Sequence, residues 1–302
     1  MHEFVDPKTL SRIKDLPLVA KTLAQGFLHG LHTGTQRGVG IEFSQYRVYE
    51  PGDDLSRVDW KLFARSDKYF VREAERESDI NAWFVLDTSA SMLQRSQISS
   101  NENSWHKLDY ARCLIATAAY LAQKQGDNVG FLSLDNDNQT FLPALSGERH
   151  WQKILLGLTR LKAQNSFPAL EHVMNQLGRV QSNGIIFVIS DFHQQSDEIV
   201  ELVGQLSNTR TDVVTIQLTC DDEELFPYKG AIRFEDLETK EQVLVSANQV
   251  KEKYYVEKQK YQTDLLTRLT KNKVKHFIAN IDEPLDQTLF DILTMRNKAV
   301  IK

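Results

Sequence analysis

The stretch DTSAS, which begins at Asp87, follows an unbroken apolar run typical of a strand covered on both faces. It places a carboxylate at Asp87 and hydroxyls at Ser89 and Ser91, and alternate residues of a tight turn can point the same way. A second carboxylate, Asp191, follows a similar apolar run. Ligands of open parallel sheets bind beyond the carboxyl ends of the strands, so we expect these four side chains to meet. Their hard oxygen atoms suit Mg²⁺ or Mn²⁺ and not zinc.

Two other interpretations of these residues stay open. An Asp often follows a strand simply because it caps the next turn or helix. A strand-end Asp is also the nucleophile of phosphatases of the haloacid-dehalogenase type, in which a second strand-end Asp helps to bind Mg²⁺. Asp87 and Asp191 fit that outline, but Ser89 stands where those enzymes carry their general acid, so leaving-group protonation would lack its carrier.

The elements that must position these residues alternate between strands and helices. Apolar periodicity predicts strands over residues 82–86, 129–134, 140–142, 184–190, 212–218 and 274–278, and helices over 108–122, 149–162, 168–180, 197–206, 251–270 and 285–296. This order predicts an α/β domain with a doubly wound, mostly parallel sheet and one antiparallel edge strand. A hairpin is expected near residues 230–246. We also expect an N-terminal extension, with a helix and a charged hairpin, that packs against the domain.

Composition limits the possible functions. The 302 residues are 41% hydrophobic and 25% charged, with a formal net charge of -5 and a pI of about 5.9. This balance argues against a nucleic-acid-binding surface, which is usually strongly basic. The two cysteines lie far apart in apolar runs, which favours buried thiols in a reducing compartment. The N-terminus lacks the pattern of a signal peptide, so we expect a cytoplasmic protein without membrane insertion.

The segment Gly38–Ser66 mixes dense charge with aromatic residues around a Pro-Gly turn. A solvated network of ion pairs, worth little stability, is the simpler interpretation. Arg–carboxylate pairs could instead fix the segment on the main domain or form an interaction surface. The candidate residues for that surface are Arg47, Tyr49, Asp53, Asp54, Arg57, Asp59, Trp60 and Arg65.

The D-x-S-x-S arrangement resembles the metal-ion-dependent adhesion site of von Willebrand factor type A domains, which have the fold just inferred. The resemblance implies that Asp87, Ser89, Ser91 and Asp191 hold a Mg²⁺ or Mn²⁺ ion whose coordination a partner's Glu or Asp completes. That family also supplies a threonine from a loop before the later strand. The corresponding stretch here, LKAQNSFPALEHVM, has none. Ser166 is the first candidate substitute, and its neighbour Asn165 is the second.

The charged segment resembles the signature of the bacterial domain-of-unknown-function family fifty-eight, through GIEF, RVYEPGDD, RVDW and AR; FEDLETKEQV and DEPLDQTLFDILTMR resemble its C-terminal part. The resemblance implies an extension over residues 1–79 and a von Willebrand type A-like domain over 80–302, in the family's short type without N-terminal membrane helices. It also implies a non-enzymatic adaptor that acts with a MoxR-type AAA+ ATPase in the assembly or activation of other proteins. An adaptor with a degenerate metal site remains an alternative.

Overall fold

The computed structural model describes residues 15–24, 45–48, 69–73, 81–96, 105–134, 140–180, 184–193, 197–207, 211–290 and 292. The chain divides into two compact units. One unit comprises Met1–His29 and Ile80–Lys302, and the other comprises Gly30–Asp79. The domain boundary that we predict between residues 79 and 80 stays a prediction.

The larger unit is built on a six-stranded sheet in the order β10-β7-β6-β3-β4-β5. The strands are β3 (Asn81–Asp87), β4 (Asn128–Leu134), β5 (Phe141–Leu145), β6 (Gly184–Ser190), β7 (Asp212–Thr219) and β10 (Lys275–Asn280). Every neighbouring pair is parallel except β4 with the edge strand β5. The predicted fold class, α/β with one antiparallel edge strand, is confirmed.

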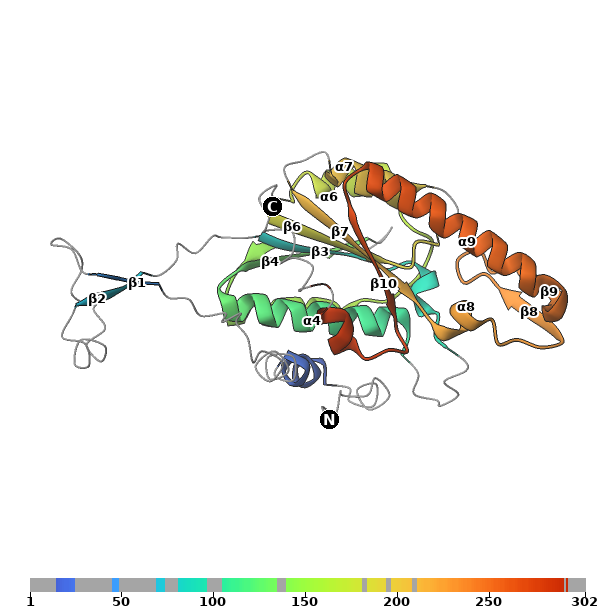
Figure 1. Cartoon of the computed structure of the whole chain (residues 1–302), viewed down its shortest axis with the longest axis horizontal. Coiled ribbons are helices and arrows are strands. Elements are labelled where there is room, and N and C mark those ends of the chain that lie inside the picture. The colour runs from blue at the N-terminus through green and yellow to red at the C-terminus, as the bar shows by residue number, and fades with distance from the viewer. Residues whose placement is uncertain are drawn as a thin grey trace. The chain divides into compact units, whose positions relative to one another are not determined.

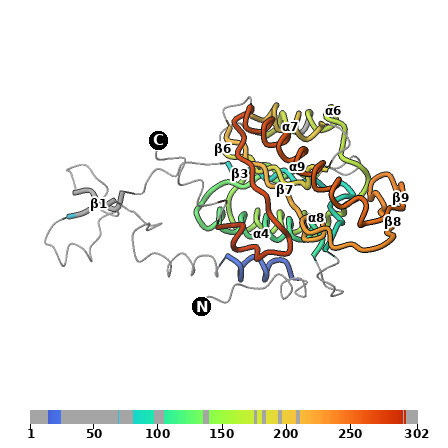
Figure 2. The backbone as a smooth tube through the Cα atoms, turned by 45° about the vertical axis from the view of Figure 1, so that its right-hand side comes forward, coloured from blue at the N-terminus to red at the C-terminus, as the bar shows by residue number. Residues whose placement is uncertain are grey.

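Helices cover both faces of this sheet. The helical elements are η2 (Ala90–Leu93), α4 (Lys107–Gln125), α5 (Glu148–Arg160), α6 (Leu170–Leu177), α7 (Glu198–Ser207), α8 (Asp221–Leu225) and α9 (Ala247–Lys271), with further helical turns at 285–290. Figure 1 shows α4 on one face and α6, α7 and α9 on the other, and the turned view in Figure 2 agrees. Periodicity missed α8 because five residues are too few to reveal a period.

Burial on both faces explains the apolar strands. All seven residues of β3 are buried, as are six of the seven in β6. On one side these strands pack with α6, α7 and α9, where Val203 and Leu269 are fully buried. On the other side α5 packs against α4, and the indole of Trp151 donates a 3.2 Å hydrogen bond to the carbonyl of Ala116. In the part of the chain that the structure describes, no helix combines the length and apolarity needed to span a membrane.

A short helix over residues 16–24 belongs to the same unit. Asp15 caps it, since its Oδ1 accepts a hydrogen bond from the backbone N–H of Leu18 at 3.1 Å. Val19 and Leu23 are buried, and the ammonium of Lys21 lies 5.2 Å from the centre of the Trp151 ring. The predicted N-terminal helix is therefore present.

Two antiparallel strand pairs stand apart from the main sheet. In the smaller unit, β1 (Gln45–Val48) pairs with β2 (Phe70–Glu73). In the larger unit, β8 (Ala231–Glu235) and β9 (Gln242–Ser246) form the hairpin expected near residues 230–246.

Candidate functional site

The candidate site lies where the order of the strands reverses. From β3 the chain adds β4 and β5 on one side, and it then returns to place β6 on the other side of β3. Loops that leave neighbouring strands at such a point diverge and leave room for a ligand at the carboxyl ends. Asp87 ends β3, and Asp191 directly follows β6, so the topology brings the two predicted carboxylates to this point.

Asp87 is fully buried and held in place by its neighbours. Its Oδ1 accepts a hydrogen bond from the backbone N–H of Ser89 at 2.8 Å, and its Oδ2 accepts one from the hydroxyl of Ser190 at 2.6 Å. Burial, together with the charge of Asp191, raises the pKa of Asp87 to about 7, although these hydrogen bonds act to lower it. The negative charge of Asp191 therefore acts on the carboxylate of Asp87, which water does not reach.

The two serines of the turn lie together. Their hydroxyl oxygens are 2.9 Å apart, and Ser89 is buried while Ser91 is partly exposed. The turn also pairs with the loop after α5, since the N–H of Ala90 donates to the carbonyl of Asn165 at 2.8 Å. Ser166 follows on that loop and is exposed. The structure thus places Ser166 beside the turn, and its role as a ligand stays a prediction.

Asp191 is also fully buried, and it faces a lysine that the sequence analysis did not single out. Lys107, the first residue of α4, is completely buried, and its Nζ lies 3.3 Å from Oδ2 of Asp191 and 2.7 Å from Oε1 of Glu223. The backbone N–H of His193 donates to Oδ1 of Asp191 at 3.2 Å. The helix that follows β7 thus contributes a third carboxylate, because Glu223 lies in the first turn of α8.

The pKa values of this group follow from its mutual contacts. Burial acts against the charge of Lys107, but Asp191 and Glu223 raise its pKa overall, so the ammonium stays charged. Burial likewise opposes ionisation of Glu223, yet Lys107 and His193 lower its pKa to about 2. Burial would lower the pKa of His193, whereas Glu223 and Asp191 raise it overall. These groups form one ionic network, which is buried at Lys107 and Asp191 and exposed at His193.

A fourth carboxylate reaches the site from the β8–β9 hairpin. Glu238 is half-buried, its Oε1 is fully buried, and this oxygen has no hydrogen-bond partner among the described residues. Burial raises the pKa of Glu238, as do Asp191 and Asp236, while hydrogen bonds with the hydroxyls of Ser89 and Ser91 lower it. Glu238 therefore faces the serine turn although about 150 residues separate them in the sequence.

Some of these residues carried a signal in the sequence. Glu223 stands just after the strand that becomes β7, the same position that singled out Asp87 and Asp191. A lysine in the first turn of a helix is unfavourable beside the positive end of the helix dipole, so Lys107 implied nearby carboxylates. Glu238 carried no such signal, because the fold of the hairpin alone brings it to the serines.

Of the predicted interaction surface, Arg47 lies in β1 of the smaller unit. The other candidates, Tyr49, Asp53, Asp54, Arg57, Asp59, Trp60 and Arg65, lie outside the described residues. The surface stays a prediction.

The candidate ligands are carboxylate oxygens of Asp87 and Asp191 and hydroxyl oxygens of Ser89 and Ser91. Such oxygen atoms suit a hard divalent cation. In the described ranges no group of three or more His, Cys, Asp or Glu side chains is arranged to hold a metal by itself. An ion here would thus depend on the serine hydroxyls as well as on Asp87 and Asp191.

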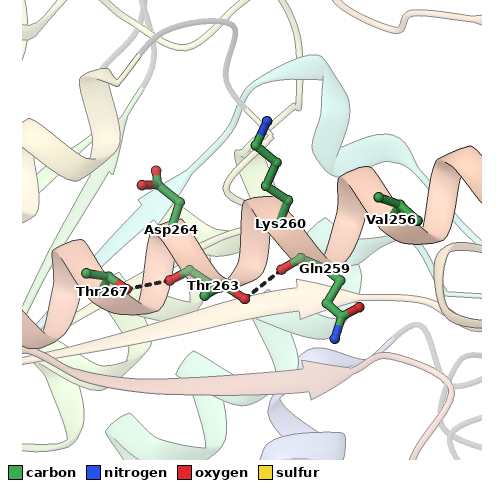
Figure 3. Close-up of a pocket in the computed structure, with 6 residues that line it drawn as sticks. All are labelled: Val256, Gln259, Lys260, Thr263, Asp264 and Thr267. Atoms are coloured by element: carbon green, nitrogen blue, oxygen red, sulfur yellow. Dashed lines mark hydrogen bonds between the residues drawn. The ribbon is translucent and has the colours of Figure 1, made fainter.

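A shallow groove elsewhere offers less chemistry. It runs along one face of α9, between Val256 and Thr267, as Figure 3 shows. The hydroxyls of Thr263 and Thr267 donate to carbonyls one turn earlier, at 2.8 and 2.7 Å, and Asp264 pairs with Arg268. These two hydroxyls and the carboxylate of Asp264 are thus engaged within the helix.

Comparison with known proteins identifies relatives of this chain. The family model described as "Protein of unknown function DUF58" matches residues 45–264, more than half of the chain. The uncharacterised protein Rv1480 of Mycobacterium tuberculosis is 32% identical over 150 residues, which are 50% of this chain and 45% of that protein. The chain thus matches less than half the length of this curated relative.

Solved structures with a similar fold include von Willebrand type A domains. The hypothetical protein BatB of Bacteroides thetaiotaomicron is 15% identical, with a TM-score of 0.43, over 71% of this chain and 99% of that one. The VWA domain of SpRpn10 is 8% identical, with a TM-score of 0.40, over 70% of this chain and 93% of that one. We base no functional inference on these likenesses, because their TM-scores lie below 0.5.

Proposed function

The chain belongs to the family of proteins of unknown function DUF58, and from this premise we propose that it is a non-enzymatic protein-interaction adaptor with a divalent-cation site at Asp87. The observation that carries the proposal is the pair of fully buried carboxylates, Asp87 and Asp191, beside the adjacent hydroxyls of Ser89 and Ser91. Buried like charges repel each other strongly in a low dielectric, and a cation between them removes that repulsion.

In this proposal Asp87, Ser89, Ser91 and Asp191 hold Mg²⁺ or Mn²⁺, and Ser166 is a further candidate ligand. The bound ion supplies a positive charge that an acidic side chain of a partner protein can bind. The chain's own residues orient that contact: Ser190 and the N–H of Ser89 fix the carboxylate of Asp87, and Lys107 fixes that of Asp191.

The partner we propose is a MoxR-type AAA+ ATPase, which would act with this adaptor in the cytoplasm on a client protein during assembly or activation. The support for this partner is the resemblance of the charged segment to its family. The site offers no support for the phosphatase alternative, because Ser89 stands where those enzymes carry their general acid.

Calorimetric titration with Mg²⁺ and Mn²⁺ tests the metal site. The wild-type protein should bind saturably, and Asp87→Ala should lose that binding while its circular dichroism stays unchanged. Asp212→Asn is the matched control, because Asp212 is exposed at the opposite, amino end of β7. Wild-type protein that binds neither ion would overturn the metal site.

A second candidate function is the same adaptor with a degenerate site. The observation in its favour is Lys107, whose buried ammonium already lies 3.3 Å from Asp191 and can take the place of a metal ion. In that case the titration gives no binding, and the charged segment around Arg47 and Arg57 carries the interaction.

A further inference from the structure

The β8–β9 hairpin has an inner face that packs on the rest of the larger unit. Figure 1 shows the hairpin beside the first turns of α9, and the turned view in Figure 2 agrees. Phe234 of β8 lies opposite Val243 of β9, and Ile232 lies opposite Val245. Residues directly opposite each other share a face, so these four apolar side chains lie together. The ring of Phe234 lies 6.2 Å from that of Phe226, which anchors this face.

The hydrogen bonds of the hairpin leave part of the β9 backbone facing outward. The N–H of Asp236 donates to the carbonyl of Glu241 at 2.9 Å. Hydrogen-bonded and non-bonded pairs alternate along an antiparallel ladder, so Leu244, opposite Arg233, belongs to a non-bonded pair. The N–H and C=O of Leu244 therefore point away from β8, as do those of Gln242. Within the described ranges, no hydrogen bond from outside the hairpin reaches the backbone of Gln242 or Leu244.

The two free edges of the hairpin differ in charge. The edge of β8 carries Arg233 and Glu235, both exposed. The strand β9, with the sequence QVLVS, has no charged residue, no proline and no bulge, and Val243 and Leu244 are 58% and 68% exposed. Sheets in soluble proteins normally protect a free edge with one of these features. The edge of β9 is therefore suited to pair with another strand, and the edge of β8 is not.

An open apolar hollow adjoins the inner face of the hairpin. Its volume is about 380 Å³, and its apolar lining comes from β8, β9, the segment after β7 and α9, through Phe226, Phe234, Val245, Val250 and Tyr254. A strand added to β9 would place its own side chains beside Val245, at this hollow. Pairing at the edge would thus also cover apolar surface, which stabilises association.

We propose that β9 pairs with β9 of a second copy of this chain, antiparallel about a two-fold axis at Leu244. The argument for a second copy is the charge pattern. About this axis Gln242 lies opposite Ser246 of the second copy, and Val243 lies opposite Val245 of the second copy, so no like charges meet. Leu244 lies opposite its own counterpart, and the two exchange both backbone hydrogen bonds.

The charged edges of β8 end the resulting four-stranded sheet on both sides. Each copy has one uncharged hairpin edge to offer, so this pairing closes at a dimer and does not continue into a fibre. The inference goes beyond the proposed function and requires no metal ion. A failed Mg²⁺ or Mn²⁺ titration would therefore leave it intact.

Sedimentation equilibrium of the full chain tests the dimer. The mass should rise from 34.7 kDa toward twice that value as the protein concentration increases. Leu244→Lys should raise the dissociation constant of the dimer about tenfold or more, because an apolar pair is lost and like charges then face each other across the axis. Val256→Lys is the matched control, because Val256 is an apolar residue of α9 that is 63% exposed. It should leave the dissociation constant unchanged.

A charge exchange tests the two-fold axis itself. Leu244→Glu should weaken the dimer as Leu244→Lys does, and an equal mixture of the two variants should form a mixed dimer, because position 244 faces position 244. Circular dichroism of each variant checks that the exposed substitution leaves the fold unchanged.

Three results would overturn the proposal. A wild-type chain that stays monomeric at every soluble concentration leaves the edge to a strand of a different protein. Equal dissociation constants for Leu244→Lys and Val256→Lys would place the dimer interface elsewhere. Two weakened variants that form no mixed dimer would exclude the axis at Leu244.

Discussion

Buried charge at the carboxyl ends of three neighbouring strands is the dominant feature among the individual residues. Asp87 ends β3, while Asp191 and Glu223 follow β6 and β7. Among the described residues, Lys107 is the fully buried cation beside them. Since burying an unpaired charge costs several kcal/mol, a stable fold would not retain this excess of carboxylates without a compensating interaction. A divalent cation is the compensation that we propose.

A different titratable group, His276 on β10, makes stability depend on pH. Burial lowers its pKa to about 4, and its ring nitrogens lie 2.8 Å from the hydroxyl of Thr215 and 3.3 Å from Oε1 of Gln217. The hydroxyl of Thr215 also donates to the carbonyl of Lys275 at 3.2 Å, so burial, and not the contact with Thr215, disfavours the protonated ring.

The sign of the pH effect follows from the two pKa values. An unfolded chain has a His pKa of about 6.5, above the folded value of about 4, so the unfolded state binds more protons between these values. Stability from this residue is therefore present at pH 7 and is lost as the pH falls toward 4. Between pH 7 and pH 5 the loss is about 2 kcal/mol.

We expect urea unfolding of the wild-type protein to show this loss, and His276→Gln to show a pH dependence smaller by about that amount, because its side chain does not titrate. If the free energy of unfolding changes equally with pH in the two proteins between pH 7 and pH 5, His276 is not the source of the pH dependence.

Among the elements, the close pairing of β3 with β6 is what brings Asp87 to Asp191. The two strands pair in parallel from Asn81 with Gly184 to Leu86 with Ile189. Gly184 begins β6 with a φ of 143°, and a Cβ there would lie 2.0 Å from the carbonyl oxygen of Asn81. Only glycine permits this approach, so the register at the site depends on it.

Substitution of this glycine should therefore be costly. Gly184→Ala must displace the backbone of β3, and we expect a loss of roughly 2 kcal/mol or more in the free energy of unfolding. Gly157 in α5 offers a matched control, since the nearest atom to an added Cβ is an ordinary contact at 3.5 Å.

Gly157→Ala should raise the free energy of unfolding by about 0.5–1 kcal/mol, because alanine loses less conformational entropy in a helix. Urea denaturation of both variants measures the difference. Two variants of equal stability would show that the close approach of β3 and β6 does not limit the fold.

At the scale of the whole molecule, two surfaces compete for the role of partner-binding site. One is the Asp87 site in the larger unit, and the other is the charged segment, of which Arg47 is the described member. The family match begins at residue 45 and therefore includes both. The match covers less than half the length of the mycobacterial relative. The function of the whole protein therefore stays a proposal.

Binding to a purified MoxR-type ATPase from the same genome separates the two surfaces. The proposed function predicts that Asp87→Ala weakens binding at least about tenfold, as expected when a charged interfacial contact is lost. Arg47→Glu and Arg57→Glu should leave binding unchanged, as should Lys153→Glu on the exposed face of α5.

The opposite pattern, with binding lost in the arginine variants and kept in Asp87→Ala, would favour the degenerate site. Circular dichroism of each variant in the presence of Mg²⁺ checks that folding is retained.

The fold class and the two strand-end carboxylates could be predicted from the amino-acid sequence alone. Unbroken apolar runs specify strands covered on both faces, and alternation with amphipathic helices leaves a parallel sheet as the way to bury them. The positions of Asp87 and Asp191 at the ends of such runs followed directly, because chain direction fixes which ends of parallel strands share an edge.

Which other residues join these two carboxylates depends on how distant segments pack together. Lys107 comes from a helix and Glu238 from a hairpin turn, and both reach the site through packing between segments far apart in the chain. Local periodicity reports how a segment folds, but it does not report where that segment docks. The charge balance of the site, and hence the case for a cation, therefore became visible only once the elements were assembled.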